Sequence, residues 1–187
     1  MRQEEQSTKK ISLVIRKWHS ALFNLFPRKR HDKKGSFKLI SDHMESRPAT
    51  AADRSDVIAL WTKCGLTRPW NSPEEDFDFA LNGPSSTVIV LEHDARIVGS
   101  AIVGHDGHRG TVYYVSICPD QQGRGLGAEL MRAAEDWLRA CGIWKINLLV
   151  RRENSSAVRF YEEQGYQDQD CIALGKRLDG RADRSTT

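Results

Sequence analysis

The 187-residue sequence lacks several features that would assign it to a common class. No apolar run approaches the roughly 18 residues of a membrane-spanning helix, which excludes an integral membrane protein. The four cysteines are scattered without a C-x-x-C pair, which argues against a zinc ribbon, a redox dithiol or a disulfide scaffold. We therefore expect no metal site and a reducing, cytoplasmic location, with the cysteines serving as small hydrophobic residues.

Positive charge is in excess only in the N-terminal quarter. Residues 1–45 hold eleven basic and five acidic residues, a balance of +6, whereas the whole chain carries +3. Residues 46–187 are therefore mildly acidic, at −3. A reader of duplex DNA needs basic charge on its folded face, so we expect no nucleic-acid partner.

The N-terminal segment has an organisation of its own. Apolar residues recur at helical spacing from Ile11 to Leu25 among basic ones, and Pro27 follows, which predicts a basic amphipathic helix and then a charged linker over 28–45. Three interpretations stay open: contact with an anionic membrane surface, docking onto the body or a partner, or a loosely ordered extension. We predict an N-terminal extension at 1–45, one domain at 46–180 and a polar tail at 181–187.

Hydrophobic periodicity predicts an α/β domain. Helices are expected at 53–64, 73–81, 126–141 and 154–164, and strands at 87–91, 97–103, 111–117 and 145–150, with one bent or two short strands over 166–178. Short links make the first three strands an antiparallel meander. The strand–helix–strand order places 145–150 parallel to 111–117.

A glycine-rich turn, Gln122-Gly123-Arg124-Gly125-Leu126-Gly127, joins the third strand to the longest helix. Glycines let backbone N–H groups converge on an anion, and the helix N-terminus adds about half a positive charge. The turn therefore indicates a diphosphate site, although a simple helix-entry turn with positive φ has the same composition. The Gly-Lys-Ser/Thr step of a nucleoside-triphosphate loop is missing. A dinucleotide fingerprint is the closer rival, but five residues including Pro119 separate its first glycine from the strand.

Four segments in register resemble the GNAT N-acetyltransferases. Gln122-x-x-Gly125-x-Gly127 is similar to the family's Q/R-x-x-G-x-G/A signature, and Ile117-Cys118-Pro119 to its strand-ending hydrophobic-x-Pro. The run from Asn154 through Ala157 to Phe160-Tyr161-Glu162, and Gly165-Tyr166 after it, resemble the family's next two motifs. Residues 66–71 (LTRPWN) and 107–110 (GHRG) further resemble a YpeA-like bacterial branch.

The resemblance implies a GNAT fold, with a mixed central sheet of about six to seven strands and about four flanking helices. It implies direct transfer of an acetyl group from acetyl-CoA to a primary amine, with the coenzyme held between strands 111–117 and 145–150. The implied coenzyme-binding residues are Val115, Ser116, Ile117, Gln122, Gly123, Arg124, Gly125, Leu126, Gly127, Asn154 and Tyr161. For Asn154, helix capping is a second role compatible with the first.

The resemblance also implies that Tyr161 protonates the departing thiolate, although the same residue could simply be a packed helix aromatic. No acid lies on strand 111–117, so Asp106, His105 and His108 in the preceding connection are the nearest candidates for a general base; turn formation or a water chain are the alternatives. The candidate acceptor-binding residues are Arg68, Trp70, Asn71 and Tyr114.

Other functions stay open beside acetyl transfer. An acyl-CoA-binding module without turnover would explain the missing strand carboxylate, and a dinucleotide-binding oxidoreductase would explain the glycines. The implied partners are an amine acceptor and, as one assembly seen in the family, a second copy of the chain.

Overall fold

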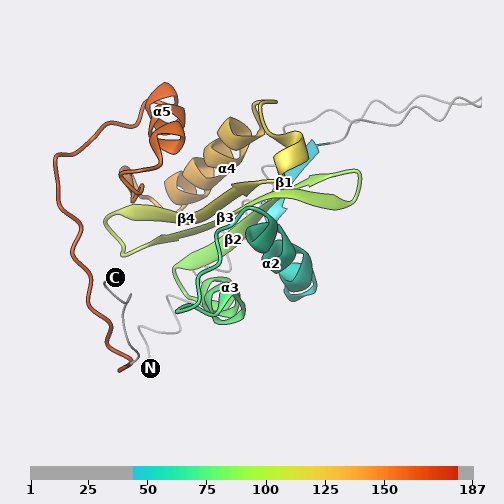
Figure 1. Ribbon diagram of the computed structural model, residues 1–187, viewed down its shortest axis with the longest axis horizontal. Coiled ribbons are helices and arrows are strands. Elements are labelled where there is room, and N and C mark those ends of the chain that lie inside the picture. The colour runs from blue at the N-terminus through green and yellow to red at the C-terminus, as the bar shows by residue number, and fades with distance from the viewer. Residues whose placement is uncertain (1–43, 181–187) are drawn as a thin grey trace, which may run out of the picture.

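The computed structural model describes residues 44–180, which form one five-stranded sheet in the order β1-β2-β3-β4-β5 (Figure 1). The strands are β1 Met44–Pro48, β2 Ser86–His93, β3 Arg96–His105, β4 Gly110–Ile117 and β5 Ile146–Leu148. All neighbours are antiparallel except β4 and β5, which are parallel. The meander and the parallel crossover predicted from the link lengths are both confirmed.

Four α-helices cover the two faces of the sheet: α2 Arg54–Lys63, α3 Pro73–Asn82, α4 Leu126–Ala140 and α5 Ser155–Glu163. Helices α4 and α5 lie over one face, and α2 and α3 over the other (Figure 1). The caps follow the sequence, since Ser72 Oγ accepts the Glu75 N–H and Asn154 Oδ1 accepts the Ala157 N–H, each at 3.2 Å. Three core clusters result: one around Leu130 under α4, one around Trp61 under α2 and α3, and a smaller one of Leu91, Val98 and Leu126.

The first strand, β1, was not expected, because residues 28–45 are predicted to be a linker. It pairs with β2, and Arg47 fixes it by donating to Asp53 at 2.9 Å and Glu92 at 2.7 Å. Both carboxylates come from elements elsewhere in the sequence. The linker therefore ends before Met44, and the sheet gains an edge strand whose apolar content is too low for sequence patterning to detect.

The final strands predicted over 166–178 are absent from the described residues, so the sheet has five strands there rather than six to seven. Asp170 adopts a left-handed φ of 50°, and the Asp168 carboxylate accepts its N–H at 2.9 Å. This local turn competes with the extended backbone that a strand needs. The chain then runs as irregular structure, with Ile172, Leu174 and Leu178 about nine-tenths exposed.

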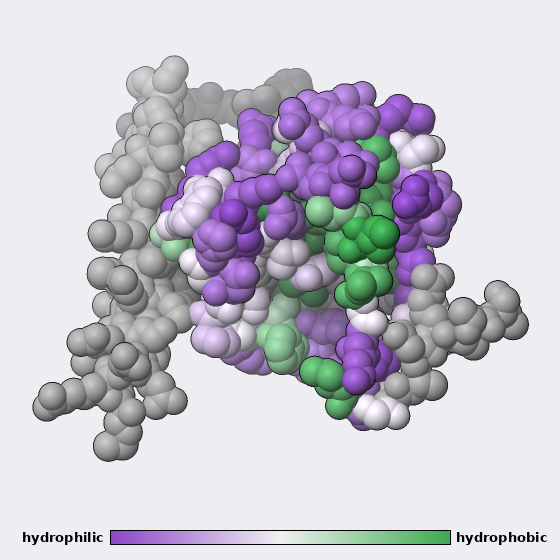
Figure 2. Space-filling view, turned by 90° about the vertical axis from the view of Figure 1, so that its left-hand side faces the viewer, coloured by the Kyte–Doolittle hydropathy of each residue, from purple (hydrophilic) through white to green (hydrophobic). Residues whose placement is uncertain are grey.

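The surface beside the C-terminal segment is mixed in character. Figure 2 shows hydrophobic groups there among a mainly hydrophilic face. The predicted helix at 11–25, most of the linker and the polar tail at 181–187 lie outside the described residues. Between residues 44 and 180, no helix is long and apolar enough to cross a membrane.

Candidate active site

Strand β4 has a free edge beside the point where β5 ends. Pairing with β5 is limited to Gly110–Val112 on β4, although β4 continues to Ile117. Among residues 44–180 no strand pairs with the remaining part of that edge, Tyr113–Ile117. An extended ligand can therefore add to the sheet there through main-chain hydrogen bonds.

A β-bulge distorts β4 at the same place. Ser100 pairs with Ser116 and Ile102 with Tyr113, so two residues, Tyr114 and Val115, lie opposite one residue of β3. Tyr114 has φ 53°, a conformation that costs a non-glycine residue about 1–3 kcal/mol. Such strain persists where the surroundings enforce it, and it is concentrated at functional sites.

Buried hydrogen bonds hold the bulge in place. Trp61 Nε1 donates to Ser100 Oγ at 2.9 Å, and Ser100 Oγ shares a 2.9 Å bond with Ser116 Oγ. Both serines are buried. The Ser116 side chain, one of the implied coenzyme contacts, is therefore committed to the core.

The glycine-rich turn forms an open cradle at the N-terminus of α4. Gly123 and Gly125 have φ of 73° and 80°, and a Cβ built on either would meet no atom within 4 Å. Gly125 is the N-cap, and no side chain accepts the first N–H groups of α4, unlike α3 and α5, which Ser72 and Asn154 cap. The Ala128 N–H donates to the Gly125 carbonyl at 3.1 Å, whereas the N–H groups of Leu126 and Gly127 have no acceptor within the helix and can bind an anion.

The other residues of the turn have structural roles. A Cβ on Gly127 would lie 3.0 Å from the Phe160 ring, so this glycine permits close packing of α5 on α4. Gln122 Nε2 donates to the Ile117 carbonyl at 3.0 Å, which ties the turn to the end of β4. The Arg124 guanidinium donates to Gln121 at the surface. Leu126 is buried.

Tyr161 lies on α5, on the α4 side of the sheet. It packs against the core cluster that also contacts Val115 and Ile117, with its ring 5.0 Å from that of Phe160 and 5.6 Å from that of Tyr166. Burial raises the pKa of its phenol, so the hydroxyl stays protonated at neutral pH. A protonated phenol therefore packs on the same core cluster as Val115 and Ile117, which belong to the free-edge part of β4.

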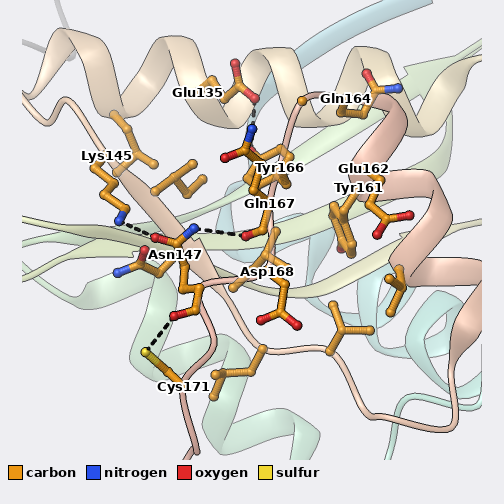
Figure 3. Close-up of a pocket in the computed structure, with 18 of the residues that line it drawn as sticks. Glu135, Lys145, Asn147, Tyr161, Glu162, Gln164, Tyr166, Gln167, Asp168 and Cys171 are labelled. Atoms are coloured by element: carbon orange, nitrogen blue, oxygen red, sulfur yellow. Dashed lines mark hydrogen bonds between the residues drawn. The ribbon is translucent and has the colours of Figure 1, made fainter.

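A large cavity opens on the outer side of β5 (Figure 3). It has a volume of about 1550 Å³ and lies between the C-terminal half of α4, β5, α5 and residues 164–173. Of the implied coenzyme contacts only Tyr161 lines it. No residue of the glycine cradle lines this cavity.

The opposite face of β4 carries a polar cluster around Tyr114. The Tyr114 hydroxyl donates to Asp76 Oδ2 of α3 at 2.6 Å. Burial and then this bond raise the pKa of the phenol, whereas the Asn71 side chain and the positive charge of Arg68 oppose the rise. The structure thus brings three of the four predicted acceptor residues together with Asp76, which sequence analysis missed.

The fourth predicted residue, Trp70, lies in the same loop. Its carbonyl accepts from the Arg177 guanidinium at 3.1 Å, and Arg177 also pairs with Asp179. The C-terminal segment is therefore fastened to the loop over 66–71. This contact also escaped sequence analysis, because 107 positions separate its partners.

The candidate general bases are not brought to the bulge. Asp106 Oδ1 accepts the N–H groups of His108 and Arg109 at 2.7 and 2.6 Å, and the His108 ring contacts Trp144 edge-on at 5.1 Å. This connection precedes the first residue of β4, and four strand residues at roughly 3.3 Å each put Tyr114 about 13 Å further along. Asp106 and His108 therefore organise the turn and not the bulge. His105, the third candidate, is the last residue of β3, and its ring lies 5.7 Å from that of Trp137 on α4.

Comparisons with a family model and with known proteins agree on one family. A sequence model described as the acetyltransferase (GNAT) family matches residues 50–166. An acetyltransferase of Pectobacterium atrosepticum is 44% identical over 135 residues, covering 72% of this chain and 96% of the relative. One from Yersinia enterocolitica has the same identity and coverage.

Solved structures show the same fold. The aminoglycoside N-acetyltransferase AAC(6')-Iy in complex with CoA superposes with a TM-score of 0.64 at 14% identity, covering 73% of this chain and 95% of that one. Glucosamine-6-phosphate N-acetyltransferase from Arabidopsis thaliana superposes with a TM-score of 0.57 at 21% identity, covering 73% and 99%. At these identities the likeness concerns the fold alone.

Proposed function

Because the chain belongs to the GNAT acetyltransferase family and has its mixed α/β fold, we propose that it moves an acetyl group from acetyl-CoA to a primary amine. The observation that carries the proposal is the free edge of β4 at Tyr113–Ile117, next to the open glycine cradle of α4. One ligand can place an extended arm along the free edge and a diphosphate in the cradle only if the edge and the cradle adjoin. The Gln122–Ile117 hydrogen bond joins them.

The residues fit acetyl-CoA chemically. Backbone N–H groups over 123–127 would bind the diphosphate, and a side chain at Gly123 or Gly125 would fill the space that the phosphates need. The main chain of Val115, Ser116 and Ile117 would pair with the pantetheine arm. Asn154 caps α5 with its Oδ1, so any contact it makes to the arm is added to that capping role. When bound, the coenzyme supplies an activated acetyl thioester.

Two tyrosines, Tyr161 and Tyr114, lie on opposite sides of β4. Tyr161 packs with the cluster under α4, whereas Tyr114 packs with the cluster under α2 and α3. Tyr161 would supply a proton to the thiolate on one side, and the amine would approach from the side of Tyr114. The bulge leaves one extra residue of β4 without a partner on β3, and a backbone N–H at the bulge is a candidate donor to the developing oxyanion.

Thiol release tests this function. Full-length protein with acetyl-CoA and a panel of amino acids, polyamines, aminoglycosides and peptides is expected to release free thiol with at least one acceptor, together with an acetylated amine. An acyl-CoA-binding module would bind CoA in calorimetry and release no thiol with any of them. A dinucleotide oxidoreductase would bind NAD(P) instead; the mainly antiparallel sheet with one parallel pair disfavours it.

Two further proposals concern the setting of the enzyme. The cysteines of the described residues, all free thiols, support a reducing cytoplasm. The exposed apolar side chains Ile172, Leu174 and Leu178 favour a homodimer through the C-terminal segment, which sedimentation of the full chain would detect.

A further inference from the structure

The polar cluster on the α3 side of β4 contains one positive and one negative group that are not paired with each other. Arg68 and Asp76 both act on the Tyr114 hydroxyl, but no ion pair within 4.0 Å joins them in the described part of the chain. Both side chains are partly exposed, and so are open to a ligand. Elsewhere on this side, opposite charges are paired directly, as Arg54 is with Asp78 at 2.9 Å.

Each of the two groups is held in place and keeps free hydrogen-bonding capacity. Arg68 Nη1 donates to the carbonyls of Gly65 and Thr67 at 2.6 and 2.7 Å, and among residues 44–180 its Nε and Nη2 donate to no acceptor. Asp76 Oδ2 accepts from Tyr114, and its Oδ1 accepts no hydrogen bond from a described residue. The site therefore presents guanidinium N–H donors and a carboxylate oxygen that lack partners of their own.

The neighbouring charged residues Arg177 and Asp78 already have partners of opposite charge. Arg177 is occupied by Asp179 and by the Trp70 carbonyl. Asp78, two residues after Asp76 on α3, is occupied by Arg54. Arg68 and Asp76 are thus the charged pair around Tyr114 with capacity to spare.

We propose that Asp76 and Arg68 select an acceptor that carries both charges, an amino acid, with Asp76 binding its ammonium group and Arg68 its carboxylate. A guanidinium fork matches a carboxylate, and a carboxylate oxygen accepts from an ammonium group, in two charge-assisted contacts. Tyr114 positions Asp76, and the strained backbone of the bulge fixes Tyr114. The inference rests on the proposed function and names the acceptor class for the same site.

The experiment compares L-amino acids with their amides, which keep the ammonium group and lack the carboxylate. Binding to the full-length protein is measured by calorimetry, and turnover by thiol release. For the preferred amino acid, the amide is expected to bind at least about tenfold more weakly. Arg68→Gln should abolish the difference between acid and amide, whereas Asp76→Asn should weaken both about tenfold or more and leave the KM for acetyl-CoA unchanged.

Arg54→Gln and Asp78→Asn are the matched controls, since they remove the same two charges from an ion pair between α2 and α3 on this side of the sheet and should leave the acid-to-amide ratio unaltered. Because Arg68 also fastens its loop, Arg68→Lys is included to keep the charge, and Asp76→Glu should recover part of the acceptor affinity. Equal binding of acid and amide by the wild-type protein would overturn the inference, as would a ratio that survives Arg68→Gln. Thiol release with polyamines alone, insensitive to Asp76→Asn, would overturn it while leaving acetyl transfer intact.

Discussion

Replacing Gly125 by valine should remove coenzyme binding while costing little more stability than the same change at a matched site. Gly125 has φ 80°, where an L-residue costs at least about 1–2 kcal/mol. Gly142, at the other end of α4, has the same φ of 80° and the same open surroundings. Gly125→Val and Gly142→Val should therefore lower the free energy of unfolding by similar amounts.

The two variants should differ in affinity for CoA. A side chain on Gly125 enters the space above the first N–H groups of α4, and hydrogen bonds to a charged group contribute about 1.5–3 kcal/mol each. Losing two of them costs about 3 kcal/mol or more, which is about a hundredfold in Kd. Gly142→Val should leave the Kd unchanged.

Calorimetry with CoA and with pantetheine, which lacks the diphosphate and the adenosine, separates the contribution of the nucleotide end from that of the arm. For Gly125→Val, CoA affinity should fall toward that of pantetheine, and pantetheine affinity should stay at the wild-type value. Thermal melting of both variants shows that they fold. If Gly125→Val binds CoA as tightly as Gly142→Val does, the assignment of the phosphates to this turn is refuted.

Three further changes test the roles of individual residues. Tyr161→Phe should lower kcat with little change in acetyl-CoA affinity, because it removes a protonated donor and keeps the ring; an unchanged kcat would exclude the acid role. Gly127→Ala should destabilise α5 by about 1–3 kcal/mol, since the methyl group would press on the Phe160 ring at 3.0 Å, and a further Phe160→Leu change should recover part of the loss in urea unfolding. Asp53→Asn should cost about 2 kcal/mol at pH 7. Because Arg47 lowers the pKa of the Asp53 carboxyl, its stabilisation is present above the unfolded pKa near 4 and lost as the pH falls below it, so wild type and variant should converge in acid; a pH-independent difference would contradict the ion-pair role.

Much of the sheet and the helices could be predicted, because their signals are local. Ser72 and Asn154 cap the helices that their positions in the sequence indicate, and Gly142 follows the end of α4. Because these signals are local, the prediction was wrong for the first strand of the sheet and for the final strands. The strand Met44–Pro48 is held by Arg47 through carboxylates from other elements, and within the strands predicted over 166–178 Asp168 and Asp170 form a turn instead.

The candidate site could be predicted from the sequence only where its residues belong to one continuous segment. The glycine turn and Tyr161 belong to continuous motifs, and their surroundings in the structure are compatible with the predicted roles. Asp76 gave no such signal, because an acid in the first turn of a helix is expected from the helix dipole alone, and its partner Tyr114 lies 38 positions away. Asp106 and His108 are titratable residues close in sequence to β4, yet they lie before its first residue, and the bulge lies near its other end.

The most direct measurement is the crystal structure of the full-length protein with CoA. We expect the diphosphate to accept hydrogen bonds from backbone N–H groups within 123–127, and the pantetheine arm to pair with the β4 edge at Tyr113–Ile117. A coenzyme lodged instead in the 1550 Å³ cavity outside β5, with the glycine turn untouched, would contradict the account.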